Sequence, residues 1–319
     1  MKWFLFLFFV HLSALKVDKV VIWGCKLHSH THSYIHYGFD KAFRHLGYKT
    51  YWFDENDNVS DFDFKNTLFI TVGLADKKIP VRDDCYYLLH NPENPALKEM
   101  VGKKRAITFQ VYTHDVLPRP GLIRLDRCTF VAKDYHCVYM PWATDLLPHE
   151  IDAIMQKVPI SKERVLVWVG TYNNGSFGNY SELQPFIRAS RKNKIGFRHI
   201  NPWTQPASME ENIELIQKSY LAPAIVGAWQ KEKGYIPCRI FKNISYGRLG
   251  ITNSQTVFEL FEGKVIYNSD TEKLFYDAYR LTPEEEKKLV LEQMQFVKER
   301  HTYLNRASLL LDTLEKFAG

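Results

Sequence analysis

The sequence predicts an α/β protein made of two doubly wound domains in series, followed by C-terminal helices. Apolar runs that end in Gly, such as Lys19 to Gly24 and Arg164 to Gly170, alternate with segments whose apolar residues recur at helical spacing. The chain has 319 residues, which is long for one core, and 45% of them are hydrophobic, enough to order most of the chain. Two domains of this kind imply a cleft between them.

The first half opens with a predicted βαβ unit. The run from Lys19 to Gly24 is continuously apolar, as expected of a strand buried on both faces. Residues 34–46 carry apolar side chains at helical spacing, Gly47 follows as a C-cap, and residues 50–53 are predicted as the second strand. Further strands are predicted at residues 67–73, 85–90 and 106–112.

A polar, Pro-containing stretch at residues 145–164 separates this half from the next, and we place the domain boundary there. It gives an N-terminal domain of residues 16–158 and a C-terminal domain of residues 159–319. The second half repeats the alternation, and helices from Pro283 to Phe317 end the chain. Its predicted strands lie at residues 164–170, 197–200, 222–227 and 249–253, with helices at 182–191 and 209–219 between them.

Residues 1–15 resemble a secretory signal, with an apolar core followed by the small residues Ser13 and Ala14. The apolar run is shorter than the roughly 20 residues of a spanning helix, so a signal, a weak anchor and a lead-in to the first strand all remain open. Three of the four N-x-S sequons fall in the predicted cleft, where a glycan would obstruct binding; the four are Asn58, Asn174, Asn179 and Asn243. We therefore favour the cytoplasm or the cytoplasmic face of a membrane, with peripheral membrane association and the secretory pathway left open.

The charge and the cysteines exclude some classes of protein. The formal charge is +6 and the basic residues are dispersed, which suits a phosphate-bearing small molecule and does not support a nucleic-acid partner. The cysteines number five and form no C-x-x-C pair, so neither a disulfide framework nor a zinc knuckle is expected. We predict buried free thiols.

Two segments of the second half, one loop and one helix start, are candidate anion sites, because ligands of parallel sheets bind beyond the carboxyl ends of the strands. The loop at residues 169–179 is rich in Gly, which lets backbone N–H groups approach a phosphate, although an ordinary surface turn is an alternative. The stretch from Gly234 to Gly247 predicts a helix with Pro237 in its first turn and Arg239 and Lys242 one turn apart. Arg at a helix start can bind a diphosphate; an Arg salt-bridged inside the protein is the alternative.

The stretch P-C-R-I-F-K-N-I-S-Y-G-R-L-G-I-T-N, followed by K-V-I-Y-N and R-H-T-Y-L-N-R-A-S-L-L-L, resembles the C-terminal half of GT-B-fold glycosyltransferases. It is especially similar to the spore-maturation-type group, which has an Arg-x-Phe-x-x-x-x-x-Gly helix and a terminal His-Thr-Tyr-x-x-Arg helix. These motifs cover roughly residues 230 to 315. The resemblance implies two Rossmann-like domains facing across a cleft, with a nucleotide-sugar held by the C-terminal domain and an acceptor by the N-terminal one. It implies no metal and no cofactor, since the nucleotide-sugar is a co-substrate.

By this resemblance Arg239 contacts the donor diphosphate, and the loop at residues 170–176 lines the same site. The expected donor-binding residues are Gly170, Asn174, Gly175, Ser176, Lys231, Arg239, Lys242 and Asn243. Many retaining members of the family have Glu where this chain has Lys242, so the resemblance leaves the ribose contact and the stereochemistry open.

A cluster of histidines follows the first predicted strand in L-H-S-H-T-H-S-Y-I-H-Y-G. His28, His30 and His32 resemble the opening H-x-H of metal-dependent phosphoesterases and amidohydrolases, but no second cluster of ligands follows. In the glycosyltransferase interpretation no metal is needed, and a neutral imidazole can accept the proton of an acceptor hydroxyl. We predict His30 or His32 in that catalytic role and His36 on a helix face.

Other residues are expected on the N-terminal wall of the cleft. His90 and Glu93 follow the strand predicted at 85–90, in a stretch that could also be a Pro-bounded turn. Trp142 and Asp145 precede the domain boundary and could meet a sugar ring and a hydroxyl or serve as an interdomain anchor. With His28 these residues form the expected acceptor wall.

The leading hypothesis is a glycosyltransferase that moves a sugar from a nucleotide-sugar to a hydroxyl of a glycan, lipid or protein. A metal-dependent hydrolase that uses the H-x-H-x-H loop is the second hypothesis. A catalytically inert nucleotide- or sugar-binding relative is the third, suggested by Lys242 in place of Glu.

Overall fold

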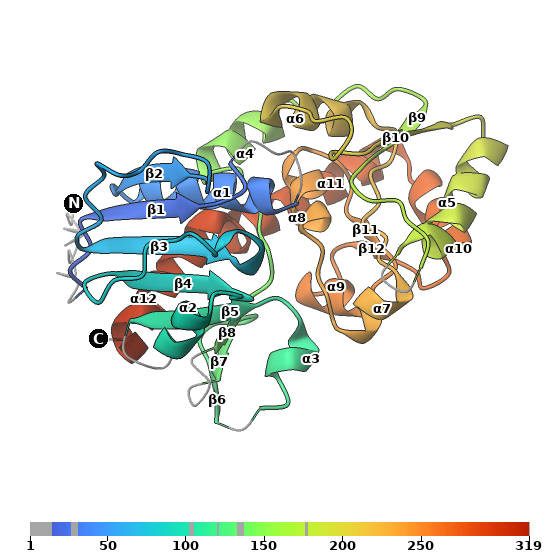
Figure 1. Ribbon diagram of the computed structural model, residues 1–319. Coiled ribbons are helices and arrows are strands. Elements are labelled where there is room, and N and C mark those ends of the chain that lie inside the picture. The colour runs from blue at the N-terminus through green and yellow to red at the C-terminus, as the bar shows by residue number, and fades with distance from the viewer. Residues whose placement is uncertain are drawn as a thin grey trace, which may run out of the picture.

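The computed structural model describes residues 15–26, 31–101, 105–119, 121–132, 137–175 and 178–318. It is a mixed α/β, Rossmann-like structure in which a large, mostly parallel sheet lies beside a smaller set of parallel strands, each with its own helices (Figure 1). The signal-like residues 1–14 lie outside the described part of the chain. Among the described helices none is long and apolar enough to cross a membrane.

The large sheet has eight strands in the order β2-β1-β3-β4-β5-β8-β7-β6. The first six in this order run parallel, and β7 and β6 are antiparallel to their neighbours. β1 to β5 confirm the strands predicted in this half, whereas β6, β7 and β8 have three residues each, too few for an apolar pattern to reveal. The bounds are β1 Lys19–Trp23, β2 Lys49–Phe53, β3 Thr67–Val72, β4 Tyr86–His90, β5 Ala106–Gln110, β6 Leu122–Arg124, β7 Phe130–Ala132 and β8 Cys137–Tyr139.

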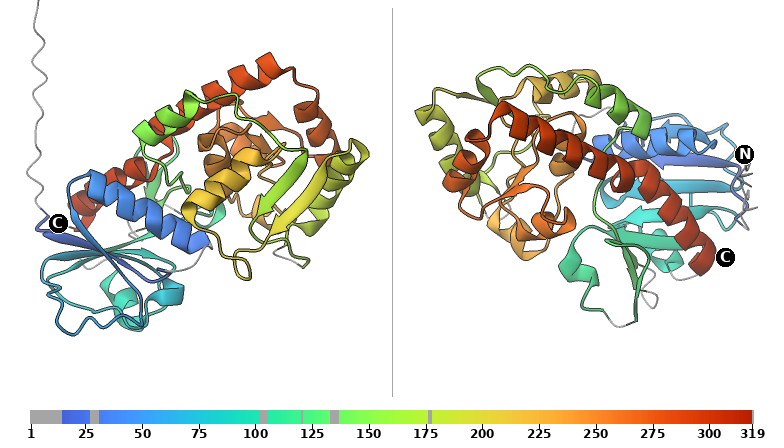
Figure 2. Two further views of the ribbon diagram at one scale, coloured as in Figure 1. Left: turned by 90° about the horizontal axis from the view of Figure 1, so that it is seen from above. Right: turned by 180° about the vertical axis from the view of Figure 1, so that it is seen from behind.

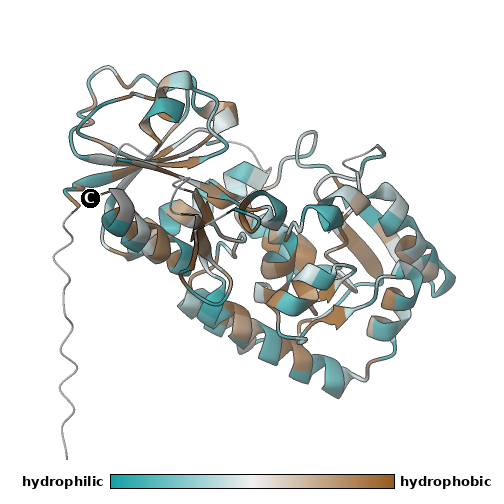
Figure 3. Ribbon diagram, turned by 90° about the horizontal axis from the view of Figure 1, so that it is seen from below, coloured by the Kyte–Doolittle hydropathy of each residue, from teal (hydrophilic) through white to brown (hydrophobic). Residues whose placement is uncertain are grey.

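Both faces of this sheet are buried, because successive strand residues point to opposite sides. On one side Val20 and Ile22 belong to the same buried cluster as Phe39 of α1 (Thr31–His45). On the other side Val21 belongs to a cluster that includes Leu97 of α2 (Pro95–Met100). The central strands β1, β3 and β4 are accordingly mainly hydrophobic, whereas the edge strands β2 and β6 expose Lys49 and Arg124. Hydrophilic residues lie on the outer faces of the helices (Figure 3).

The last helix of the chain returns to the first half and packs on α1. Helix α11 (Pro283–Arg300) runs along the second half, and after a break α12 (Tyr303–Ala318) crosses the back of the large sheet (Figure 2). At the crossing, the ring of Tyr303 occupies the space beside Gly38, where a Cβ atom would lie 2.1 Å from Tyr303 Cδ2. Gly38 therefore provides the room that lets α12 lie close to α1.

The second half contains two pairs of parallel strands, β9 (Val165–Val169) with β10 (Gly196–Ile200) and β11 (Ile251–Thr252) with β12 (Ile266–Tyr267). The segment at residues 220–226 lies between the pairs. Tyr220 N donates to Val165 O at 2.8 Å, and Ala224 N donates to Ile251 O at 2.7 Å. The predicted parallel alternation of this half is thus present, with shorter strands than expected.

Helices surround these strands. The helices predicted at 182–191 and 209–219 are present as α5 and α6, with ends within two residues of the predicted ones: α5 is Tyr180–Lys192 and α6 is Met209–Lys218. The remaining elements of the chain are η1 Gly73–Ala75, α3 Thr113–Val116, α4 Pro148–Met155, α5 Tyr180–Lys192, α6 Met209–Lys218, α7 Ala228–Glu232, α8 Cys238–Ser245, α9 Gln255–Leu260 and α10 Thr271–Tyr279.

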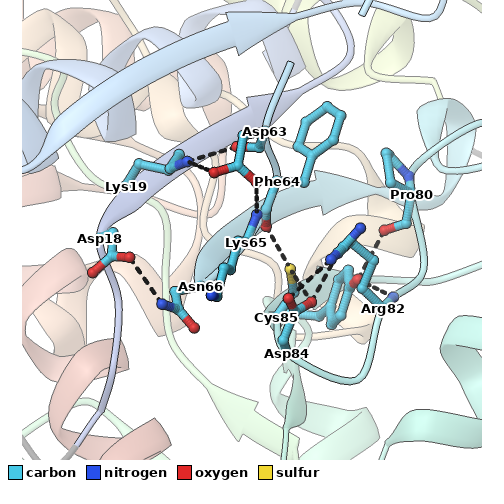
Figure 4. Close-up of polar contacts among 11 residues, drawn as sticks. Asp18, Lys19, Asp63, Phe64, Lys65, Asn66, Pro80, Arg82, Asp84 and Cys85 are labelled. Carbon is cyan, nitrogen blue, oxygen red and sulfur yellow. Dashed lines mark hydrogen bonds and ion pairs between the residues drawn. The ribbon is translucent and has the colours of Figure 1, made fainter. Parts of the chain in front are cut away.

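The amino-terminal ends of β1, β3 and β4 are tied together by polar contacts of the preceding loops (Figure 4). Lys19 Nζ donates to Asp63 O at 2.6 Å, and the Cys85 thiol donates to Phe64 O at 2.9 Å. Arg82 forms a two-pronged ion pair with Asp84 at 2.8 and 2.9 Å. These contacts occupy the loops at the amino-terminal ends of the strands. A ligand site is therefore expected in the loops at the carboxyl ends.

The chain passes between the halves in two segments, residues 140–147 and 300–303, that lie side by side. Thr144 N donates to His301 O at 2.9 Å, and Tyr303 N donates to Thr144 O at 3.1 Å. The buried guanidinium of Arg306 donates to three main-chain carbonyls, those of Pro141, Trp142 and Arg300, at 2.8, 3.3 and 3.1 Å. The Arg306 side chain thus holds both crossing segments together.

We expect Gly38→Ala to lower the free energy of unfolding by about 1–3 kcal/mol, because the added methyl group would overlap the ring of Tyr303 and the packed helices cannot give way freely. Gly196→Ala is the matched control, since its Cβ would meet atoms no closer than 3.8 Å. Urea unfolding of the two variants measures the difference. Equal unfolding midpoints would show that α12 does not press on α1 at this point.

Candidate functional site

A pocket between the halves is lined by residues from the first turns of three helices. α1 contributes Thr31 and Tyr34, α6 contributes Met209 and Asn212, and α8 contributes Cys238, Arg239 and Lys242. The end of β9 and the loop after β10 complete the wall. Helix starts carry partial positive charge and unpaired N–H groups, so their convergence favours an anion.

Arg239 is the first cation of this pocket. Its Nη2 donates to Val169 O at 3.0 Å, and its guanidinium carbon lies 3.7 Å from the centroid of the Trp168 ring, a cation–π contact. Its Nε is buried and makes no hydrogen bond within the described structure. No described carboxylate forms an ion pair with it, so the alternative of an internally salt-bridged Arg is not supported there. Burial lowers the pKa of Arg239, yet an Arg remains protonated in proteins.

Gly170 allows Arg239 to occupy this position. Its φ is +129°, and a Cβ atom at this position would lie 2.3 Å from Arg239 Nη2. His199 Nε2 lies 2.8 Å from Gly170 O and fixes the end of the strand. Gly170 was expected to let a phosphate approach the backbone. In the structure its missing side chain leaves room for the guanidinium of Arg239 at the end of β9.

Lys242 is the second cation and lies one turn further along α8. Its Nζ donates to Asn212 Oδ1 at 3.5 Å and lies 5.4 Å from the centroid of the Tyr34 ring. Burial lowers the pKa of Lys242 to about 8, with the positive charge of Arg239 acting in the same direction. Among the described residues that line the pocket none is Asp or Glu. The described lining of the pocket therefore holds two cations and no acid, while the buried carboxylate of Asp145 acts on Lys242 from outside the lining. An anionic ligand would relieve the remaining excess of positive charge.

A second hollow lies at the carboxyl ends of β3, β4 and β5 and shares Thr31 with the first. His90, at the end of β4, stacks on Phe109 with ring centroids 5.2 Å apart, and its Nδ1 lies 3.1 Å from Phe109 O. Burial lowers the pKa of His90 to about 4, so the ring is neutral at pH 7. Since a proton on Nδ1 serves the carbonyl, Nε2 is left as an acceptor, 3.4 Å from Asn91 Nδ2.

Three other predicted site residues line this hollow: the catalytic candidate His32 and the wall residues Trp142 and Glu93. His32 lies in the first turn of α1, because the helix begins three residues earlier than predicted, and its ring centroid is 6.1 Å from that of His90. Trp142 donates from Nε1 to the Tyr235 hydroxyl at 3.2 Å. Glu93 completes the set. Residues of both halves meet here, since Tyr235 belongs to the second half.

Other predicted site residues lie elsewhere. Asp145 is buried between the halves, where it accepts a hydrogen bond from the Tyr246 hydroxyl at 2.9 Å and burial raises its pKa. Lys231 forms an ion pair with Glu182 at 3.4 Å. The Asn243 side chain donates to Ala222 O at 2.7 Å.

The loop after β9 was also predicted to bind the donor. Asn174 and Gly175 lie in an exposed turn that does not line either hollow. His28, His30 and Ser176 lie outside the described residues. His36, predicted on a helix face, is buried with Nδ1 2.8 Å from Gly24 O.

Sequence reasoning missed several pocket residues. Asn212 and Tyr34 carry no motif, and Trp203 stands in the loop after β10, 65% exposed. The rule that directed attention to the loop after β9 applies equally to the loop after the strand predicted at 197–200. That rule, applied to each strand of the second half, would have singled out Trp203.

Metal and thiol chemistry can be stated for the described residues. Within them no group of three or more His, Cys, Asp or Glu is placed to hold a metal ion, and two of the three histidines of the H-x-H-x-H segment lie outside them. All five cysteines are free, and Cys25, Cys85 and Cys137 are buried as predicted, whereas Cys128 and Cys238 are partly exposed.

No family model and no curated protein matches the chain. Among solved structures, the N-terminal domain of Candida albicans trehalose-6-phosphate phosphatase is similar over 94% of this chain and 97% of that one, with a TM-score of 0.51 and 9% identity. A structure described as "OtsA apo structure" is similar over 89% of this chain and 77% of that one, with 9% identity, but its TM-score of 0.43 carries no argument. At this identity the first likeness shows the fold alone. It supports a GT-B-like fold and does not reach the spore-maturation-type group.

The charge of Lys242 predicts a pH dependence for anion binding. Sulfate keeps its charge between pH 7 and 9, whereas Lys242 loses its proton near pH 8. We expect sulfate affinity to fall as the pH rises through this range, because only the protonated amine attracts the anion. Isothermal titration calorimetry at several pH values measures the trend, and Lys242→Gln should bind more weakly with little pH dependence. An unchanged slope in Lys242→Gln would assign the titration to another group.

Proposed function

We propose that this chain is a nucleotide-sugar-dependent glycosyltransferase of GT-B architecture, in which residues 16–158 and 159–319 form domains facing across the two hollows. One observation carries the proposal. The pocket between the halves holds Arg239 and Lys242 at converging helix starts, with no acid among its described lining residues.

This arrangement suits the diphosphate of a donor. In glycosyl transfer the bond between the anomeric carbon and the phosphate oxygen breaks, and the departing nucleoside diphosphate takes the electron pair. Arg239 can bind two phosphate oxygens at once, and Lys242 and the helix starts add further positive charge where negative charge develops. These groups can supply the neutralisation without a metal ion.

The second hollow suits the acceptor. The acceptor oxygen forms the new bond to the anomeric carbon, and its proton must pass to a base. We assign His32 as the proton acceptor and His90, kept neutral by burial, as a hydrogen-bond acceptor for a hydroxyl. Tyr112, which is partly exposed, offers aromatic surface for a sugar ring. Trp142 is only 2% exposed, so we assign it as an anchor between the halves through its hydrogen bond to Tyr235. The proposal retains His30 as the other candidate for the catalytic role. Because Thr31 lines both hollows, donor and acceptor would meet at the start of α1.

The partners in this proposal are a nucleotide-sugar donor and a glycan-type acceptor, with no nucleic acid. The fold likeness to part of a protein named for trehalose-6-phosphate agrees with a ligand that joins sugar and phosphate. Peripheral membrane association stays part of the proposal for a lipid-linked acceptor.

One observation favours a second candidate, an inert nucleotide- or sugar-binding relative. Lys242 stands where many retaining members of the resembled family have Glu, and it lies buried beside Asn212, so this position offers no carboxylate to a ribose. Such a protein would bind a nucleotide and release no product, even by hydrolysis.

The proposal predicts that UDP, GDP or their sugar conjugates raise the unfolding temperature. Ligand at 100 times its Kd stabilises a protein by about 2.7 kcal/mol, so a shift of a few degrees is expected. Arg239→Gln should abolish the shift, and Lys192→Gln, an exposed Lys paired with Glu272, should keep it. A thermal-shift panel of nucleotides, nucleotide-sugars and divalent metals measures this.

Two outcomes of the panel would redirect the proposal. A shift with a divalent metal and none with any nucleotide would overturn it in favour of the metal-dependent hydrolase. Nucleotide binding with no release of nucleoside diphosphate from any nucleotide-sugar would favour the inert relative.

A further inference from the structure

Trp203 stands at the rim of the cationic pocket with its side chain largely in solvent. It is 65% exposed and lines the same pocket as Arg239 and Lys242. A single exposed apolar side chain needs no explanation by itself. The position of this one, on the wall of a pocket that already attracts an anion, gives it a specific use.

The loop that carries Trp203 is held at both ends. Asn201 Oδ1 accepts a hydrogen bond from Trp203 N at 3.1 Å, and Asn201 O accepts from Gln205 N at 2.7 Å. At the other end Ser208 caps α6, with its hydroxyl accepting from Glu211 N at 3.1 Å. The backbone of Trp203 is therefore set by its neighbours, and the ring is presented by an ordered turn.

The pocket has a charged wall and an apolar wall. The charged wall is α8, with Arg239 and Lys242. A second part of the lining comes from one segment, residues 200–209, and is mostly apolar: Ile200, Pro202, Trp203, Ala207 and Met209. A ligand that fills both needs an anionic part and a flat apolar part joined together.

We propose that Trp203 is the stacking surface for the base of a nucleoside diphosphate whose phosphates lie against Arg239 and Lys242. The inference rests on the proposed function, and it adds the position of the base, which would lie against Trp203. Stacking on an aromatic side chain tolerates every base, because each base has a π-face, so Trp203 contributes affinity for nucleotides as a class.

The test compares inorganic pyrophosphate with UDP and GDP by isothermal titration calorimetry. Trp203→Ala should weaken the affinity for UDP and GDP about 5- to 150-fold, which corresponds to the loss of one stacking aromatic. Trp203→Phe keeps a flat ring and should weaken them less than about fivefold. Pyrophosphate affinity should stay within about twofold in both variants and be lost in Arg239→Gln. Because the ring is exposed, both Trp203 variants should fold, and circular dichroism checks this.

The outcomes separate this inference from the proposed function. If Trp203→Ala binds UDP and GDP as tightly as the wild type does, the stacking role is wrong and the nucleotide-binding proposal stands. If the wild type binds UDP and GDP no more tightly than pyrophosphate, the base is not held and the stacking role is wrong, although the anion site remains. If the wild type binds none of the three probes, both proposals fall.

Discussion

The buried guanidinium of Arg306 is the constraint on which the arrangement of this protein depends. A buried charge is costly unless its donors are satisfied, and here three carbonyls from both crossing segments accept from it. Its Nη2 also lies 2.9 Å from His301 Nδ1. Burial, with the charges of Arg306 and Arg300, holds the pKa of His301 well below its usual range, so this ring is neutral and Nδ1 can accept.

The two hollows follow from that constraint. With the crossing segments paired, α12 lies on α1, and the start of α1 lies opposite α8. Asp145 and Tyr246 add a buried hydrogen bond between the halves at 2.9 Å. A shift of the halves would separate Tyr34 from Lys242, so the wall that α1 contributes to the cationic pocket depends on this relative placement.

The charge pattern inside the pocket distinguishes it from ordinary packing. The surface of the protein pairs many of its cations with acids, as Lys231 does with Glu182. Arg239 instead has an aromatic ring, a carbonyl and a buried Nε without a described partner. The guanidinium of Arg239 therefore has N–H donors that are not used within the described structure, and these donors are the reason to place an anion there.

The sequence by itself determined the alternation of strands and helices, because apolar periodicity and glycine stops are local properties, and it marked Arg239, Lys242 and Gly170. The sequence could not show that the side chain of Asn243 bonds to Ala222 O instead of lining the pocket. On α8, Cys238, Arg239 and Lys242 share an arc of about 100°, and Asn243 lies on the other side of Arg239, facing Ala222. Nor could it reveal that Lys231 meets Glu182, that Asp145 lies buried between the halves, or that Trp203 shares a pocket with Arg239. Those facts depend on contacts between residues far apart in the chain, which only the tertiary structure brings together.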